Sequence, residues 1–173
     1  GGEPLVRKGC VDFMRRLKET DGVETVTLTT NGMFVKEHID EFKHMGLDGI
    51  NISLDTLDRK QFHRLTGTDG VDAVVDAVAA CVSAGLKTKI NSVLLSETKS
   101  QILRLAHLAQ EMPVDVRFIE VMPIGFGRFE KGPTEDAVLQ ILQAEYPDLA
   151  YRRDVRGNGP AVYYGSSLLQ GHI

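Results

Sequence analysis

The stretch INISLD, Ile50 to Asp55, alternates apolar with polar residues in the manner of a β-strand. Side chains of a strand point alternately to its two faces, so one face would be apolar, with Ile50, Ile52 and Leu54. The opposite face would be polar, with Asn51, Ser53 and Asp55. A buried strand of a parallel sheet is normally apolar on both faces. The polar face therefore indicates a strand with helices on one side and something other than a packed core on the other.

Predicted strands and helices alternate along the chain around this stretch. Runs of strand-forming residues predict strands at 23–29, 50–54, 87–95 and 114–121. Apolar residues at helical spacing predict helices within 10–17, 35–45, 71–82, 102–109 and 138–142. Strands that alternate with helices at a spacing of about thirty residues form βαβ units and a parallel sheet. An open doubly wound sheet and a (β/α) barrel both fit this order.

Local signals mark several of the boundaries. Thr98 and Gln101 resemble a capping box that would begin the helix after residue 101. Thr134 is a candidate N-cap for the last helix. The tail is rich in glycine, and we expect two short strands in it, near 161–164 and 167–173.

The polar face recurs in the other predicted strands. Its members are Thr27, Thr29 and Asn31, then Lys89 and Asn91, then Asp115 and Arg117. In a dry interior each unpaired polar group would cost about 1–3 kcal/mol. We therefore expect this face to line a barrel or crevice that binds a polar ligand near the carboxyl ends of the strands. In the alternative interpretation, the Ser, Thr and Asn side chains only satisfy loop backbone.

Lys89 and Arg117 are the most informative members of this face, because inward cations need anionic partners. These partners are either ligand groups such as phosphates or nearby protein carboxylates. Asp55 and Glu120 are the candidate carboxylates.

Composition limits the classes of protein to consider. The chain has 173 residues, 42% of them hydrophobic and 25% charged, which is typical of a single globular domain. The net charge of −4 gives no support for binding nucleic acid or a membrane surface. No apolar run approaches the roughly 18 residues of a membrane span, and we expect no signal or transit segment. Cys10 and Cys81 are expected to be buried apolar residues in a reducing compartment.

Six motifs occur in an order that resembles the radical S-adenosylmethionine enzymes. They are GGEPLVRKG at 1–9, LTTNG at 28–32, INISLDTLD at 50–58, KIN at 89–91, VDVRFIEVMP at 114–123 and LLQGHI at 168–173. Within that superfamily they look like the molybdenum-cofactor biosynthesis protein A family, the GTP 3′,8-cyclases. The resemblance implies an α/β fold, an incomplete (β/α) TIM-type barrel with outer helices. Residues 1–150 would be its central part, and 151–173 would begin a C-terminal extension that leads to a second cluster.

The resemblance also implies cofactors and partners. The family uses S-adenosylmethionine and two [4Fe–4S] clusters to form a 5′-deoxyadenosyl radical, which begins the rearrangement of GTP. A cytoplasmic homodimer that binds neither nucleic acid nor membrane is expected. The family's cysteine segments have no counterpart in this sequence, so we expect an internal fragment that is inactive as given.

By the same resemblance, residues can be assigned to each ligand. The contacts to S-adenosylmethionine would be Gly2, Glu3, Ser53, Asn91, Arg117 and Met122. The contacts to GTP would be Thr29 and Lys89. No catalytic residue and no metal ligand is assigned within the chain. The alternatives are an ordinary turn at Gly1–Gly2, a helix-start carboxylate at Glu3 and a core side chain at Met122.

Other functions remain open at this point. The chain could come from a radical S-adenosylmethionine enzyme with a different substrate. It could be an aldolase-like barrel in which Lys89 forms a Schiff base with a carbonyl substrate. It could also be a barrel relic without catalytic activity that only binds a ligand or forms a dimer.

Overall fold

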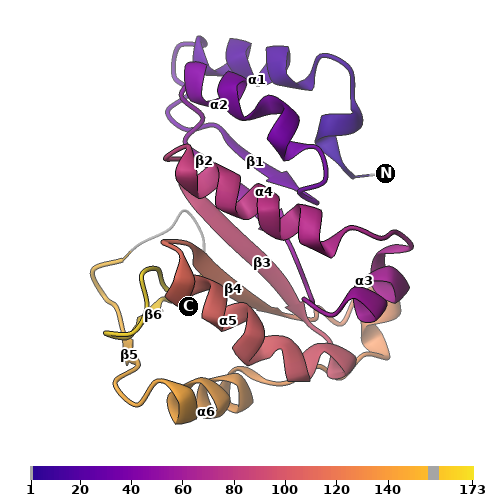
Figure 1. The fold of residues 1–173 in the computed structure, drawn as a ribbon, viewed down its shortest axis with the longest axis vertical. Coiled ribbons are helices and arrows are strands. Elements are labelled where there is room, and N and C mark those ends of the chain that lie inside the picture. Colours follow the sequence, from indigo (N-terminus) through magenta and orange to yellow (C-terminus); the bar gives the residue numbers. More distant parts are fainter. Residues whose placement is uncertain (1, 156–159) are drawn as a thin grey trace.

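The computed structural model describes residues 2–155 and 160–173, and its centre is a four-stranded parallel sheet (Figure 1). The strands are β1 (Thr27–Thr30), β2 (Gly49–Ser53), β3 (Thr88–Leu94) and β4 (Asp115–Glu120). Each strand pairs with the next one along the chain, in the order β1-β2-β3-β4. In a doubly wound sheet the order in which successive strands are added reverses at a switch point. The order therefore confirms the predicted barrel, and because β1 and β4 are its two edges the barrel is incomplete.

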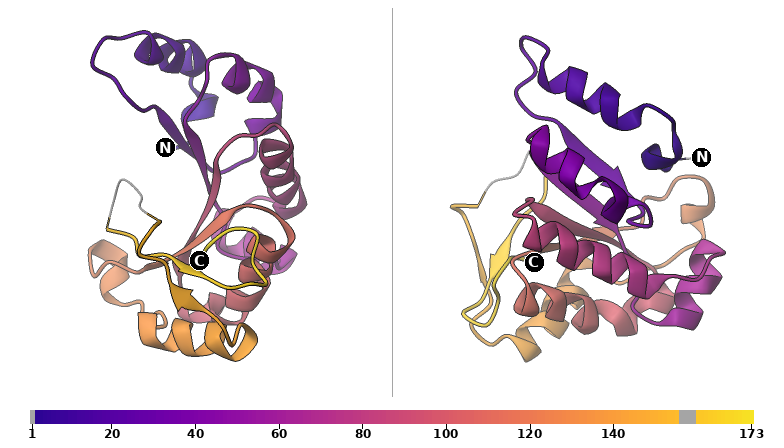
Figure 2. Two further views of the ribbon diagram at one scale, coloured as in Figure 1. Left: turned by 90° about the vertical axis from the view of Figure 1, so that its left-hand side faces the viewer. Right: turned by 45° about the horizontal axis from the view of Figure 1, so that its top comes forward.

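The helices lie on the outer side of this curved sheet, as the left view of Figure 2 shows. The α-helices are α1 (Cys10–Lys18), α2 (Ile39–His44), α3 (Arg59–Thr66), α4 (Val71–Ser83), α5 (Ile102–Glu111) and α6 (Glu135–Glu145). Short 3₁₀ helices are η1 (Pro4–Val6), η2 (Val35–His38), η3 (Ser96–Gln101) and η4 (Gly125–Arg128). The inner side of the sheet carries no helix in this view and is contacted by the tail, where Tyr163 accepts from Lys89.

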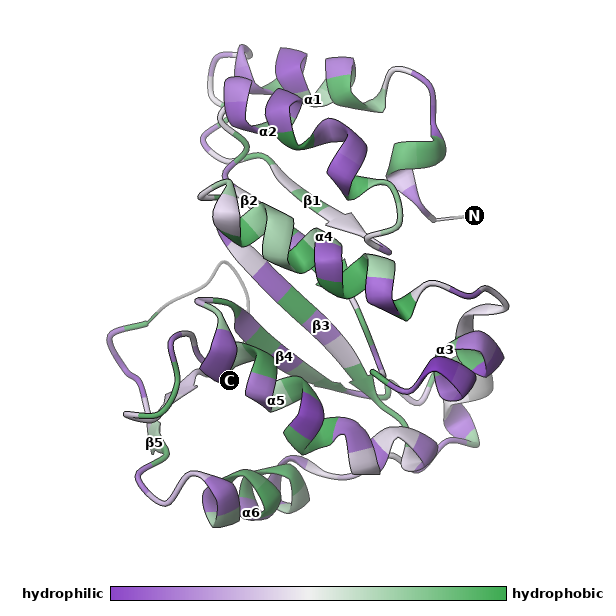
Figure 3. Cartoon of the chain, viewed as in Figure 1, coloured by the Kyte–Doolittle hydropathy of each residue, from purple (hydrophilic) through white to green (hydrophobic). Residues whose placement is uncertain are grey.

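The core lies between the helices and the outer face of the sheet. Its strand residues include Leu28, Ile50, Ile52, Ile90 and Val116, all buried. The helices contribute apolar side chains to the same cluster, among them Met14, Phe42, Val74, Val78 and Leu105. Figure 3 shows the resulting alternation of hydrophobic and hydrophilic residues along β3. The predicted division into an apolar and a polar face is therefore confirmed.

Three local predictions were wrong. β1 begins at Thr27, because the backbone N–H of Val26 donates to the carboxylate of Asp48 (2.7 Å). The Thr98–Gln101 capping box does not form, because the Thr98 hydroxyl accepts a bond from the N–H of Leu95 (3.2 Å), which places Thr98 within η3. Helix α3 was not predicted, because it buries little apolar surface and depends on its Asp58 N-cap.

The tail folds back onto the sheet instead of forming two strands of its own. One short strand, β6 (Tyr164–Gly165), pairs antiparallel with β5 (Ala150–Tyr151). Residues 167–173 form no strand, and the N–H of Val116 in β4 donates to the carbonyl of His172 (2.8 Å). The end of the tail therefore lies beside the amino end of β4. The predicted domain division at residue 150 remains a prediction.

Candidate functional site

Polar side chains form two rows across the inner face of the sheet. The register places Thr29, Asn51, Lys89 and Asp115 side by side, which we call the amino-side row. The carboxyl-side row consists of Ser53, Asn91 and Arg117. Five residues that the sequence assigned to a ligand site lie in these rows: Thr29, Ser53, Lys89, Asn91 and Arg117.

Hydrogen bonds link the two rows. Asn51 donates to the hydroxyl of Thr29 (3.2 Å) and accepts from Nη2 of Arg117 (2.7 Å). Asn51 therefore joins β1 to β4 across the inner face. The alternation of residues in β2 predicted Asn51 on the polar face, but no role in the site was predicted for it.

Lys89 pairs with a protein carboxylate that is neither of the two candidates, Asp55 and Glu120. Its ammonium group lies 3.3 Å from Asp115 Oδ2 and donates to the hydroxyl of Tyr163 (2.6 Å). Asp55 instead accepts from the N–H of Val93 (2.7 Å), and burial raises the pKa of its carboxyl group. Glu120 accepts from the N–H of Glu135 (3.0 Å). The alternative that a protein carboxylate pairs with an inward cation therefore holds for Lys89, but the carboxylate is Asp115 and neither Asp55 nor Glu120.

Two polar atoms of the carboxyl-side row are buried without a hydrogen-bond partner among the residues that the structure describes. They are Oδ1 of Asn91, an acceptor, and Nε of Arg117, a donor. The two residues are register partners on β3 and β4, and both line a cavity of about 560 Å³. Leaving such groups unpaired costs about 1–3 kcal/mol each. A ligand that offers a donor and an acceptor to this part of the sheet would remove that penalty.

A second cavity lies at the carboxyl ends of β1 and β2. Its volume is about 200 Å³, and its polar lining includes Asn31, Ser53, Asp55 and Thr68. Ser53 is exposed, so its hydroxyl is accessible. The carboxyl ends of parallel strands are where barrel folds bind their ligands.

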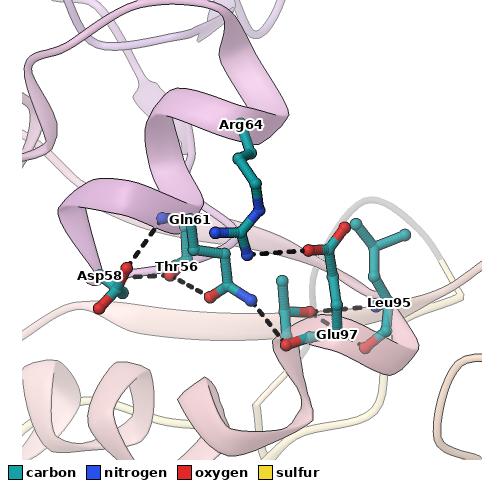
Figure 4. Close-up of polar contacts among 7 residues, drawn as sticks. Thr56, Asp58, Gln61, Arg64, Leu95 and Glu97 are labelled. Carbon is teal, nitrogen blue, oxygen red and sulfur yellow. Dashed lines mark hydrogen bonds and ion pairs between the residues drawn. The ribbon is translucent and has the colours of Figure 1, made fainter.

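A polar network, buried at Thr56 and Gln61 and exposed at Arg64, fixes helix α3 beside this second cavity (Figure 4). The hydroxyl of Thr56 donates to Oε1 of Gln61 (2.6 Å), and Nε2 of Gln61 donates to the carbonyl of Glu97 (2.6 Å). The guanidinium of Arg64 reaches the carboxylate of Glu97 (3.3 Å). The network thus joins the loop after β2 to η3.

We expect Gln61→Ala to lower the free energy of unfolding by about 1–3 kcal/mol, because Thr56 and the Glu97 carbonyl would lose their buried partner. Urea denaturation would measure this change. Gln143→Ala in α6 is the matched control, since it removes the same side chain from an exposed helical position. Equal midpoints for the two variants would show that the network adds nothing to stability.

The three remaining predicted residues lie at the chain start and after β4. Glu3 N-caps η1 through the N–H of Leu5 (3.0 Å), as the helix-start alternative proposed. Its carboxylate also accepts from the Thr30 hydroxyl (2.8 Å) and the N–H of Asn31 (2.6 Å). A carboxylate has about four acceptor positions, so Glu3 retains capacity for a ligand donor.

Gly2 and Met122 were also assigned to the ligand site. The relevant observation is the backbone conformation for Gly2 and the exposure of the side chain for Met122. Gly2 has φ 131°, which favours glycine, although a β-carbon there would meet nothing within 4 Å. Gly1 of the same motif lies outside the described residues. Met122 is 69% exposed, so the alternative that it belongs to the core was wrong. Within residues 2–155 and 160–173, no side-chain hydrogen bond joins Met122 to the two polar rows, and Gly2 has no side chain to make one.

Two contributors to the site were missed by sequence analysis, and both come from the tail. Tyr163 accepts from Lys89, and the Nδ1–H of His172 donates to Asp115 Oδ1 (2.9 Å). His172 belongs to the LLQGHI motif. The motif drew attention to this segment, but it did not predict the contact of His172 with Asp115. The alternation of polar and apolar residues in β4 predicted that Asp115 lies on the polar face. This alternation was the sequence signal for the part that Asp115 takes in the site.

The described residues do not fit as iron–sulfur ligands. Within 2–155 and 160–173, no group of three or more His, Cys, Asp or Glu side chains could hold a metal ion. Cys10 in α1 is only partly buried, contrary to prediction, whereas Cys81 in α4 is buried. Burial raises the pKa of the Cys81 thiol to about 11, and clusters require thiolates. A search of the same residues for a helix long and apolar enough to cross a membrane also found none.

Comparison with known proteins places the chain in a family. Residues 1–109 match the Radical SAM superfamily, and the chain belongs to that family. The name of that family refers to S-adenosylmethionine, in agreement with the resemblance of the motifs. Membership argues against the aldolase-like alternative, in agreement with the engagement of Lys89 by Asp115 and Tyr163.

The curated relatives indicate which enzymes of this superfamily the chain is similar to. The GTP 3′,8-cyclase of Clostridium perfringens (strain 13 / Type A) is 40% identical over 174 residues, which cover 100% of this chain and 54% of that protein. The GTP 3′,8-cyclase of Rhodopirellula baltica is 38% identical, with 86% of this chain and 43% of that protein covered. The chain thus spans about half the length of the curated relatives it matches.

Solved structures share the fold. Streptococcus suis SuiB bound to S-adenosylmethionine superposes with a TM-score of 0.67 at 22% identity, covering 84% of this chain and 34% of that chain. A domain of pyruvate-formate lyase-activating enzyme from Bacteroides vulgatus gives 0.66 at 16% identity, covering 83% and 88%. These likenesses agree with the incomplete (β/α) barrel seen here.

Proposed function

We propose that this chain is the central barrel section of a GTP 3′,8-cyclase, which acts on GTP with S-adenosylmethionine and two [4Fe–4S] clusters. The curated relatives support this assignment. The observation that carries it within the structure is the buried, unpartnered pair of Asn91 Oδ1 and Arg117 Nε on the inner face. A free acceptor beside a free donor suits a ligand with polar groups of both kinds, such as S-adenosylmethionine.

The inner face would be shared by two ligands. S-adenosylmethionine, when bound at a reduced cluster, supplies the radical for the reaction. Around it, Asn91 and Arg117 would pair with polar groups, Ser53 would offer a hydroxyl, and Met122 would border the ligand from the loop after β4. Gly2 and Glu3 would approach its amino-acid end, where the Glu3 carboxylate can accept from an ammonium group.

GTP would bind toward the amino-side row. Thr29 would offer its hydroxyl, and Lys89 would donate from its ammonium group to an anionic or carbonyl oxygen of the nucleotide. A lysine ammonium has three N–H donors, and Asp115 and Tyr163 use two of them. One donor therefore remains for a ligand oxygen.

Titration calorimetry with S-adenosylmethionine and with GTP tests this proposal. We expect Arg117→Met to raise the Kd for S-adenosylmethionine about tenfold, and Lys89→Met to raise the Kd for GTP about tenfold, because each change removes a charged hydrogen-bond donor. Lys87→Met is the matched control, since Lys87 is exposed and two positions away in sequence. Equal Kd values for Lys87→Met and Lys89→Met would contradict the assignment of Lys89.

The wild-type titrations separate the alternatives. Binding of S-adenosylmethionine without GTP would favour a radical S-adenosylmethionine enzyme with another substrate. Binding of neither ligand would favour the barrel relic. The homodimer, the lack of nucleic-acid binding and the cytoplasmic location remain predictions from the family resemblance, and sedimentation would measure the first of them.

A further inference from the structure

The tail encloses the ammonium group of Lys89 in a closed cycle of contacts. Lys89 donates to Tyr163 (2.6 Å) and pairs with Asp115 Oδ2 (3.3 Å). His172 donates to the other carboxylate oxygen, Oδ1 (2.9 Å). The rings of Tyr163 and His172 then meet edge to face, with their centroids 6.1 Å apart and an interplanar angle of 87°. We call these four residues the lysine clamp.

The clamp joins two separate parts of the chain. Lys89 and Asp115 come from β3 and β4 of the barrel, whereas Tyr163 and His172 come from the tail. The tail is fixed by its own backbone bonds, since Tyr164 and Ile173 exchange two N–H···O bonds (2.6 and 2.9 Å). The tail therefore adds a second support to a side chain that the barrel holds through Asp115.

A lysine benefits more than most residues from such support. Its stem has four carbons, and fixing a long side chain costs up to about 2 kcal/mol of rotamer entropy. Here the ammonium group is 4.9 Å from the Tyr163 ring centroid as well as bonded to its hydroxyl. The Lys89 side chain is 14% exposed and that of Asp115 16%, so the pair is shielded from water but still reachable.

We propose that Tyr163, His172 and Asp115 are positioning residues that hold the ammonium of Lys89 for an anionic or carbonyl oxygen of the nucleotide. This inference rests on the proposed function. The clamp fixes two N–H donors of Lys89 and thereby aims the third, so the entropy of ordering the side chain is paid on folding and not on binding. The tail thus determines nucleotide affinity from outside the barrel sheet.

The first test compares single-group deletions by calorimetry. Tyr163→Phe keeps the buried ring and removes only the hydroxyl, and we expect the Kd for GTP to rise about five- to tenfold. The Kd for S-adenosylmethionine should not change, because no clamp residue is assigned to that ligand. Tyr151→Phe is the matched control, since Tyr151 lies in β5 and is exposed.

Rescue distinguishes positioning from a structural role. His172→Ala should weaken GTP binding by a similar factor, whereas His172→Gln should restore it, because a Gln amide can still donate to Asp115. His107→Ala, which removes a half-exposed histidine of α5 that pairs with Glu145 of α6, should leave the Kd for GTP unchanged. A Kd for GTP that is unchanged in Tyr163→Phe and His172→Ala would overturn the inference.

A spectroscopic readout keeps the inference testable if GTP does not bind. The ammonium protons of a lysine give an NMR signal when hydrogen bonds slow their exchange with water. We expect a Lys89 ammonium signal in the wild type that is lost in Tyr163→Phe and retained in Tyr151→Phe. A wild type that binds no GTP would overturn the proposed function. The NMR signal of the Lys89 ammonium group would then be the test of the clamp. A signal that persists in Tyr163→Phe would overturn the clamp.

Discussion

Gly171→Ala is expected to lower the free energy of unfolding by about 3 kcal/mol, because a β-carbon at this position would overlap the carbonyl oxygen of Val114. The obstacle is backbone, which cannot rotate away as a flexible side chain could. The tail would have to move away from β4. The N–H groups of Gln170 and Gly171 both donate to the carbonyl of Ala109 (2.8 and 3.1 Å), and these bonds would be lost as well.

Urea denaturation and amide hydrogen exchange would measure this effect. Gly49→Ala is the matched control, because a β-carbon there would make only ordinary contacts at 3.4 Å or more and φ lies outside the left-handed region. We expect Gly49→Ala to change stability by less than about 1 kcal/mol. Faster exchange in the tail of Gly171→Ala should accompany weaker GTP binding if the lysine clamp operates. Equal stability of the two variants would show that the tail is not tightly docked.

The inner face was predictable because it depends on a local property. Alternation with a period of two assigns each side chain to a face without reference to any other strand. Thr29, Asn51 and Lys89 could therefore be grouped before their register was known. The parallel order of the strands then placed them side by side.

The partners of these residues were not predictable in the same way. Tyr163 is 74 positions from Lys89 in sequence, and His172 is 57 from Asp115. Both contacts arise because the tail folds back over the inner face, and no periodicity in the sequence encodes that path. The choice of Asp115 over Asp55 followed from the register of β3 with β4, which sequence alone does not give. The ordered motifs indicated the family, but the geometry around Lys89 had to come from the structure.

Phe42→Ala should lower the free energy of unfolding by about 3–5 kcal/mol, the range found when a buried aromatic ring is truncated. Phe42 lies in α2, is 0% exposed and belongs to the core on the outer face of the sheet. Ser53→Ala, on the inner face, removes an exposed hydroxyl and should change stability by no more than about 0.5 kcal/mol.

The pair of variants tests whether stability and ligand binding are divided between the two faces. Urea denaturation gives the first quantity, and titration with S-adenosylmethionine gives the second. Ser53→Ala should raise the Kd for S-adenosylmethionine several-fold, since a neutral hydrogen bond contributes about 1 kcal/mol. Phe42→Leu, which keeps most of the apolar volume, should recover much of the stability lost in Phe42→Ala. A Ser53→Ala variant as unstable as Phe42→Ala would show that the polar rows support the fold, because the outer face alone would then not account for the stability of the sheet.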